Sequence, residues 1–133
     1  MKKAFISISF NKKNELEDEI TAIAEVLKKH DMNPFVFVNA YNFSSDKERE
    51  MMHKATKEIA TSDLLIAEVT DKAIGVGIEI GYAYALGKKI IYLRKKQAEY
   101  STTVGGIANK HVIYSNNEDL KTKLGKALSK LRF

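Results

Sequence analysis

The sequence predicts a doubly wound α/β domain in which five parallel strands alternate with helices. Three observations carry this prediction. Short β-rich segments alternate with longer segments whose apolar residues recur at helical spacing. The links between them are short. Each helix therefore has to carry the chain back to the end of the sheet at which the previous strand began, so that the next strand runs parallel to it. The segment from Leu64 to Val69 is apolar on both faces apart from Glu68, which is typical of a central parallel strand.

The first half of the chain supplies two strands and two helices. Alternating, β-rich residues from Lys3 to Ser9 predict the first strand, and apolar residues at helical spacing predict a helix that begins at Asn14. The second strand is predicted over residues 34–38. A second helix is predicted from Ser45 to about Thr61, because Ser45 as N-cap and Glu48 three residues later form the pattern of a capping box.

The second half begins with the central strand and continues the alternation. The later elements are expected, in order, as a helix from Val76 to Leu86 that ends at Gly87, a strand from Lys89 to Leu93, a loop with a short helix between Gln97 and Asn109, a strand from Val112 to Tyr114, and a helix from Asn117 to Leu131. We expect a single three-layer domain over residues 1–133, flavodoxin-like or Rossmann-like, with strand order 2-1-3-4-5. This order puts a topological switch point between the first and third strands.

The composition of the chain argues against several classes of function. The 133 residues fit one domain, with 44% hydrophobic and 29% charged residues. The net charge of +5 is dispersed along the chain, whereas nucleic-acid-binding proteins usually concentrate it, so we expect no nucleic-acid partner. No apolar run is long enough to span a bilayer, and the chain has no cysteine, so we expect no membrane association and a cytoplasmic location. The three histidines are far apart in sequence, and we expect neither a metal site nor a cofactor.

The most informative residue is Glu79. It follows the central strand and a Gly75-x-Gly77 pattern, which we interpret as a turn that puts Glu79 in the first turn of the next helix. A first-turn glutamate could simply complement the helix dipole. Its place at the carboxyl end of a central parallel strand instead indicates a site, because Ser7 and Ser9 end the first strand beside the same crevice.

At these residues the chain resembles the nucleoside 2-deoxyribosyltransferase superfamily, and within it the short 2'-deoxynucleoside 5'-monophosphate N-glycosidases. The likeness is carried by three segments, Ser62 to Thr70, Gly75-x-Gly77-x-Glu79-x-Gly81-x-Ala83, and Gly87 to Ile91. The resemblance implies an enzyme that breaks the N-glycosidic bond of a (deoxy)nucleoside or its 5'-monophosphate, by hydrolysis or deoxyribosyl transfer.

The resemblance also implies roles for individual residues. Glu79 would be the nucleophile that forms a glycosyl-enzyme ester. Ser9 would contact the substrate, with Ser7, Gly75 and Gly77 beside it. Ser101, with Thr103, would reach the phosphate of a neighbouring subunit's substrate, which implies a homo-oligomer that is at least a dimer.

The sequence departs from the family pattern at positions where the family has polar residues in addition to the glutamate. Ala55 stands where an aspartate helps to protonate the leaving base, and Ala73 stands where a serine or acidic residue precedes the glycines. Glu58, one turn beyond Ala55, and Asp71 are the other candidate acids. The residues after the first strand include no arginine, and Lys12 or Lys13 could take its place as a phosphate contact.

Two other functions remain open on these residues. A nucleotide-binding module with weak or no catalysis would keep the crevice and is favoured by Ala55 and Ala73. A TIR-like NAD-cleaving domain also places a glutamate in a parallel-sheet crevice, although the Gly-x-Gly-x-Glu context argues against it. Tyr41 and Phe43, in a polar loop, could stack on a base or simply pack in the loop.

Overall fold

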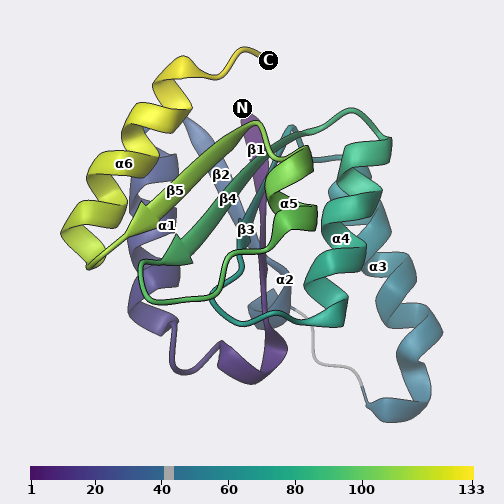
Figure 1. Ribbon diagram of the computed structural model, residues 1–133. Helices are drawn as coiled ribbons and strands as arrows, with labels where there is room; N and C mark the ends of the chain where they lie inside the picture. The colour runs from purple at the N-terminus through teal and green to yellow at the C-terminus, as the bar shows by residue number, and fades with distance from the viewer. Residues whose placement is uncertain (41–43) are drawn as a thin grey trace.

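Five parallel strands form the centre of the fold, in the order β2-β1-β3-β4-β5 (Figure 1). The structure is a computed structural model that describes residues 1–40 and 44–133. The strands are β1 (Lys2–Ile8), β2 (Met32–Val36), β3 (Leu64–Glu68), β4 (Lys89–Lys95) and β5 (Lys110–Tyr114). The predicted fold class and strand order are therefore confirmed, and β1 and β3 lie side by side at the switch point.

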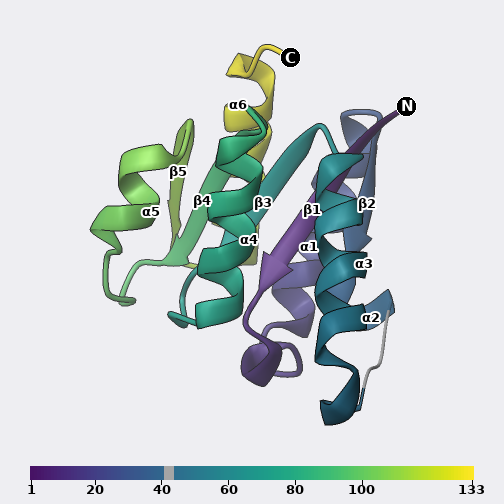
Figure 2. The same cartoon turned by 90° about the vertical axis from the view of Figure 1, so that its right-hand side faces the viewer.

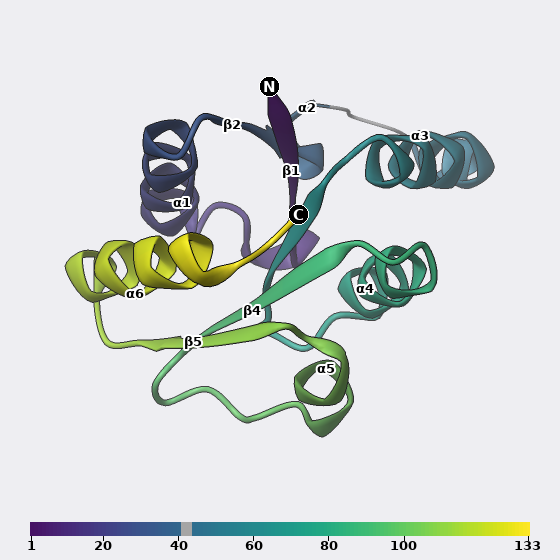
Figure 3. The ribbon, with the colours of Figure 1, turned by 90° about the horizontal axis from the view of Figure 1, so that it is seen from above.

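Helices cover both faces of the sheet. They are α1 (Glu17–Lys29), α2 (Phe37–Ala40), α3 (Glu48–Ala60), α4 (Ile74–Ala85), α5 (Thr102–Ile107) and α6 (Asn117–Lys130). Figure 3 shows α1 and α6 on one face and α3, α4 and α5 on the other. Figure 2 shows α3 and α4 side by side in front of the sheet. Both chain ends lie at the amino end of the sheet, away from the switch-point crevice.

Alternation along the strands divides the core into two apolar layers. Ile6 and Ile66 belong to the layer beneath α1 and α6, whereas Phe5 and Leu65 belong to the layer beneath α3 and α4. Successive strand side chains point to opposite faces. Ser7 therefore shares the face of Phe5, and Glu68 shares the face of Ile66.

Several predicted boundaries are wrong, because local turns precede the helices. α1 begins at Glu17 and not at Asn14, since a 3-10 turn at Phe10–Lys12 comes first. α3 begins at Glu48, after a second 3-10 turn at Ser45–Lys47, so Glu48 is its first residue and the capping box is not formed. The second strand ends at Val36, because the chain turns into α2 at once.

The carboxylate of Glu68 joins three strands beneath α1 and α6. Its oxygens accept hydrogen bonds from the Tyr114 hydroxyl at 2.5 Å, the Thr70 hydroxyl at 2.8 Å and the Thr70 amide at 2.7 Å. The Lys95 amide donates to the Thr70 hydroxyl at 3.0 Å. Burial raises the pKa of Glu68, and the bonds from Tyr114 and Thr70 partly offset that rise. This cluster ties the carboxyl ends of β3, β4 and β5 together.

Within residues 1–40 and 44–133, none of the helices combines the length and the apolar character that crossing a bilayer requires.

We predict that Tyr114→Phe lowers the free energy of unfolding by about 1–3 kcal/mol, because a buried carboxylate loses a hydroxyl donor. Urea unfolding followed by circular dichroism measures the change. Tyr84→Phe is the matched control, since the Tyr84 side chain is exposed and should change stability by less than about 0.5 kcal/mol. Equal effects of the two substitutions would contradict a structural role for the Glu68 cluster.

Candidate active site

Ser7 and Ser9 lie at the carboxyl end of β1, beside β3. Ser7 pairs with Ala67 in the parallel register, and Ser9 follows the last strand residue. Both serines are buried. Because β1 lies between β2 and β3, its end is held at the switch point, and Ser7 points toward α3 and α4 as the strand alternation requires.

Glu79 reaches this point from α4. The helix begins at Ile74, so Glu79 is its sixth residue and lies in the second turn, not in the first as the sequence predicted. Gly75 and Gly77 are also inside the helix, so they do not form a turn before it. The prediction failed because the N-cap, Ala73, has no side-chain capping bond and gives no sequence signal for the helix start.

The carboxylate of Glu79 has one side-chain hydrogen-bond donor among the described residues. The Ser7 hydroxyl donates to Glu79 Oε1 at 2.5 Å. Burial raises the pKa of Glu79 to about 7, and the bond from Ser7 partly offsets this rise. A carboxyl group in a crevice whose pKa lies near neutral pH is a typical candidate for catalysis.

Glu79 faces a cavity of about 480 Å³, a size suited to a small organic ligand. Its walls come from the end of β1, from α2, from α3 and from the start of α4. Most of the lining is apolar, including Phe37, Met51 and Val76. The polar side chains among the lining residues are Ser9, Asn11, Ser44, Glu48 and Glu79. A side chain at Gly75 would meet no atom within 4 Å, so this glycine leaves room beside Glu79.

Ser9 is paired with a second carboxylate. Its hydroxyl donates to Asp71 Oδ2 at 2.6 Å, from the loop that joins β3 to α4. Ser9 lines the cavity, whereas Asp71 is not one of its lining residues. In this arrangement Asp71 accepts a hydrogen bond from Ser9 and does not offer a proton to the cavity.

The remaining predicted site residues lie on the other side of α4. Gly77, Ser101 and Thr103 line a separate cavity of about 270 Å³. Ser101 is the N-cap of α5, because its hydroxyl accepts from the Val104 amide at 3.3 Å, and its own amide donates to the Tyr92 hydroxyl. Within one chain, Ser101 and Thr103 therefore do not face Glu79. Their role at a partner's site stays a prediction.

The candidate acids do not come together at Glu79. Glu58 forms an ion pair with Lys3 at 2.7 Å, at the amino end of β1, so its suggested role as an acid is wrong. Ala55 and Ala73 both line the cavity. At these two positions the wall is therefore apolar, whereas the family pattern has polar groups there. Tyr41 and Phe43 lie outside the described residues. No group of His, Asp and Glu residues in the described part of the chain converges as metal ligands.

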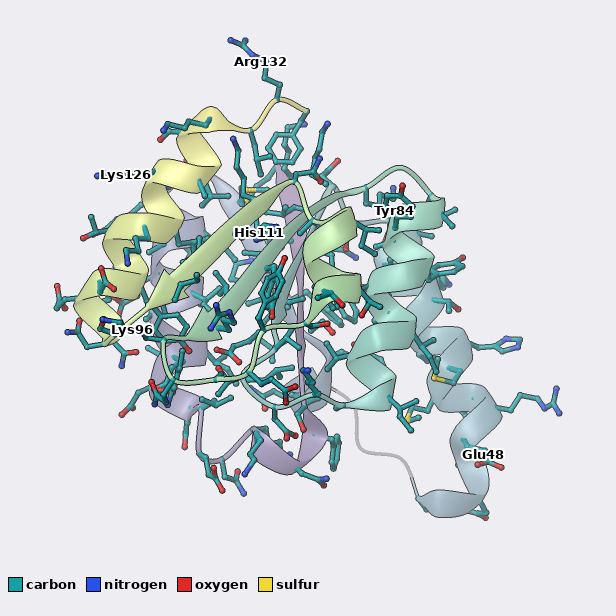
Figure 4. The ribbon with its side chains drawn as sticks, in the orientation of Figure 1. Glu48, Tyr84, Lys96, His111, Lys126 and Arg132 are labelled. Atoms are coloured by element: carbon teal, nitrogen blue, oxygen red, sulfur yellow. The ribbon has the colours of Figure 1, made fainter. Side chains whose placement is uncertain are left out.

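Sequence reasoning assigned no cavity role to Glu48, Met51 or Met52. All three line the cavity from α3. Figure 4 shows Glu48 near the lower end of α3, at the same end of the molecule as the carboxyl ends of the strands. Only their helical spacing after a polar loop could have indicated a shared face. The switch-point argument placed Ser7 and Ser9 beside the same crevice as Glu79, but no sequence pattern indicated which carboxylate each serine contacts.

The comparisons with known proteins cover most of the chain. A family model for nucleoside 2-deoxyribosyltransferases matches residues 7–124. The fold is similar to that of a CMP N-glycosidase from Clostridium botulinum, BcmB, with 25% identity, a TM-score of 0.66, and coverage of 92% of this chain and 98% of that one.

Two further solved structures share the fold. A 2-deoxyribosyltransferase from Bacillus psychrosaccharolyticus has 15% identity, a TM-score of 0.70, and coverage of 90% of each chain. A conserved protein from Enterococcus faecalis has 17% identity, a TM-score of 0.72, and coverage of 96% and 99% of the two chains. Comparison with curated protein sequences gives no match.

We predict that Glu79→Gln stabilises the protein at pH 8. The pKa of Glu79 rises from 4.5 to about 7 on folding, so ionising the folded protein is harder than ionising the unfolded chain. Stability contributed by the neutral carboxyl is therefore lost as pH rises from about 4.5 to 7, and the loss amounts to about 2–4 kcal/mol above pH 7. Glutamine is never charged and avoids this cost. Thermal unfolding at pH 8 should show a higher Tm for the variant.

The same measurement at pH 4.5 is the control. There Glu79 is neutral in the folded protein, so the two proteins should differ much less. A stability difference that is independent of pH would contradict a raised pKa for Glu79.

Proposed function

This chain belongs to the nucleoside 2-deoxyribosyltransferase family, and we propose that it cleaves the N-glycosidic bond of a (deoxy)nucleoside or its 5'-monophosphate with Glu79 as nucleophile. One observation carries the proposal. A carboxylate held by Ser7, with a pKa of about 7, faces a cavity of about 480 Å³ at the switch point of the sheet. Of the groups that line this cavity, Glu79 combines nucleophilic character with a fixed orientation.

The reaction proceeds in two displacements at the anomeric carbon. A Glu79 oxygen attacks that carbon, the C–N bond breaks, and its electron pair leaves with the nucleobase, which gains a proton. Water or a second nucleobase then attacks the same carbon and releases Glu79. Because only the ionised carboxylate is a nucleophile, base release should rise as pH increases through about 7.

The cavity determines which steps the protein can assist. Ser7 orients the carboxylate, and the cavity around it is lined mostly by apolar side chains. Ala55 offers no proton to the leaving base, so the position where the family pattern has an acid gives no assistance here. General acid assistance is worth about 10²–10⁴-fold, so we expect slow turnover compared with an enzyme that has such an acid.

The second candidate is a nucleotide-binding module with weak or no catalysis. It is favoured by the same alanines, since a binding site needs the cavity but no acid. The two functions differ in one product, the free nucleobase.

We predict that Glu79→Gln abolishes base release while the protein stays folded and still binds its ligand. Glutamine is nearly isosteric and can accept the bond from Ser7, but it cannot form the glycosyl ester. Incubation with a panel of nucleosides, nucleoside monophosphates and NAD, followed by chromatography, measures released base. Equal rates for wild type and variant would eliminate Glu79 as nucleophile.

A second variant separates slow chemistry from binding alone. Ala55→Asp places a carboxyl group in the cavity wall, at the position where the family pattern has an aspartate. If wild type is inactive and this variant releases base, the Glu79 site is competent and lacked only an acid. If the folded variant binds nucleotide and releases nothing, the binding module is the better description.

We also propose that the protein acts in the cytoplasm as a homodimer that buries the outer face of α4. Ile74, Ile78 and Tyr84 are 85%, 52% and 56% exposed, and Glu79 is the only charged residue of the helix. Gly77 and Gly81 lie among them, so a second helix could approach closely. Figure 1 shows α5 beside α4, and Figure 4 shows Tyr84 near the upper end of α4. Such an interface would bring Ser101 and Thr103 near the partner chain.

We predict that Ile74→Asp combined with Ile78→Asp shifts the protein from dimer to monomer, because two charges would be buried in the interface. Light scattering at micromolar concentration measures the mass. Ile113→Asp is the matched control, since Ile113 is also exposed but lies on β5. A wild type that is already monomeric would contradict the dimer.

A further inference from the structure

Four lysines gather where the edge strand β5 packs against α6. A hollow of about 240 Å³, here called the lysine groove, is lined by residues of these two elements alone. One lysine lies on β5, and three lie on α6 at the spacing i, i+3, i+7, which puts them on one face of that helix. The lining residues are Lys110, His111, Val112, Lys123, Lys126, Ala127 and Lys130.

The alternation of β5 explains how a cation comes to lie beneath α6. Val112 and Tyr114 belong to the apolar layer beneath α1 and α6. Lys110 comes two residues before Val112 and therefore points to the same face of the sheet. Val112 and Ala127 are both buried and apolar. The lysine groove thus has apolar side chains at its base and ammonium groups around it.

The charge of the lysine groove is not balanced by neighbouring acids. None of its described lining residues is Asp or Glu. Lys123 forms an ion pair with Asp119 at 3.1 Å and donates to the Ile113 carbonyl at 2.7 Å. Within residues 1–40 and 44–133, no carboxylate lies within ion-pair distance of Lys110, Lys126 or Lys130.

Burial makes Lys110 the most informative of the four. Lys123, Lys126 and Lys130 are exposed, and water alone could solvate them. Lys110 is half-buried, so its ammonium gives up part of its hydration without gaining a carboxylate partner. Such a cation is costly to bury unpaired. An anion bound in the lysine groove would offset that cost.

Two nearby features oppose an anion, and neither cancels the lysines. Asp119 is beside Lys123, and it also accepts a hydrogen bond from the Ser115 amide. The carboxyl end of α6 carries about half a negative charge, and Lys130 lies in its last turn. Together these features amount to about one and a half negative charges against four lysines. The balance of charge in the lysine groove is therefore positive.

We propose that the lysine groove binds a linear polyphosphate group, either free or as the phosphate chain of a nucleoside triphosphate. Such a chain carries several negative charges over a short length, which matches four cations around one hollow. Lysine suits this ligand because its ammonium is a point charge with three donors and needs no bidentate geometry. No Phe, Tyr or Trp is among the described lining residues, so the bases of a nucleic acid would find no stacking surface there.

The lysine groove is separate from the cavity beside Glu79. The cavity lies at the carboxyl end of β1, on the face of the sheet that α3 and α4 cover. The lysine groove starts at the amino end of β5, on the face that α6 covers. Figure 4 shows Lys126 on the opposite side of the molecule from Glu48, which lines the cavity. The inference therefore does not depend on the proposed function.

The test measures binding of inorganic tripolyphosphate, ATP and orthophosphate by calorimetry at low ionic strength, where electrostatic attraction is screened least. We expect tripolyphosphate to bind at least about tenfold more tightly than orthophosphate, because it meets more of the lysines at once. Lys126→Gln combined with Lys130→Gln should weaken tripolyphosphate binding by about tenfold or more. Both side chains are exposed, so the variant should unfold at the same temperature as the wild type.

Lys54→Gln combined with Lys57→Gln is the matched control. It removes the same two charges from exposed positions on α3, outside the lysine groove and on the other face of the sheet. Tripolyphosphate affinity should change less than about twofold in this variant. If both double variants lose affinity equally, the net charge of the protein and not the lysine groove attracts the anion, and the inference is wrong.

The probes also distinguish the sources of the phosphate chain. ATP binding that is lost in the Lys126, Lys130 variant would support the inference with a nucleotide as ligand, whereas binding of tripolyphosphate alone would support it with a free polyphosphate. A single-stranded oligonucleotide that binds more tightly than either probe would overturn it in favour of a nucleic acid, and so would absence of binding by both probes. Base release from nucleosides tests only the proposed function and should be equal in the wild type and both double variants.

Discussion

The burial of one carboxyl group, Glu79, against Ser7 is the constraint on which the candidate site depends. Removing a carboxylate from water costs free energy, and the hydrogen bond from the Ser7 hydroxyl offsets only part of that cost. The pKa of Glu79 therefore rises to about 7. The arrangement needs β1 and α4 in fixed relation, because Ser7 and Glu79 come from distant parts of the chain. The sheet supplies that relation by holding β1 between β2 and β3.

Two carboxylates, the buried Glu68 of β3 and the partly buried Glu79 of α4, lie on opposite faces of the sheet. Glu68 points toward α1 and α6 and accepts three hydrogen bonds. These bonds help to hold the carboxyl ends of β3, β4 and β5 together. Glu79 is on the other side of the sheet, accepts from one side-chain donor among residues 1–40 and 44–133, and borders a cavity. The number of donors and the space nearby, not burial alone, distinguish a structural acid from a reactive one.

The amino end of α4 and the cavity wall act together on any ligand. The helix brings Gly75 and Glu79 to the cavity wall, and a side chain at Gly75 would meet no atom within 4 Å. Serine hydroxyls, the Asn11 amide and two carboxylates supply the polar groups, so the wall offers both donors and acceptors. Family membership shows the class of chemistry, and these groups are the ones that a ligand in the cavity would meet.

Much of the fold was predictable from the sequence because hydrophobic spacing and short links leave few topologies. The alternation of elements, the strand order and the place of Glu79 after β3 follow from local pattern and the right-handed crossover rule. The start of α4 was not predictable, since Ala73 carries no capping signal, and this misplaced Glu79 by one helical turn. The pairings of Ser7 with Glu79 and of Ser9 with Asp71, and the contribution of α3 to the cavity, were decided only by tertiary structure. They join residues far apart in sequence, and hydrogen-bond partners and burial depend on the packed positions of whole elements, which no local pattern contains.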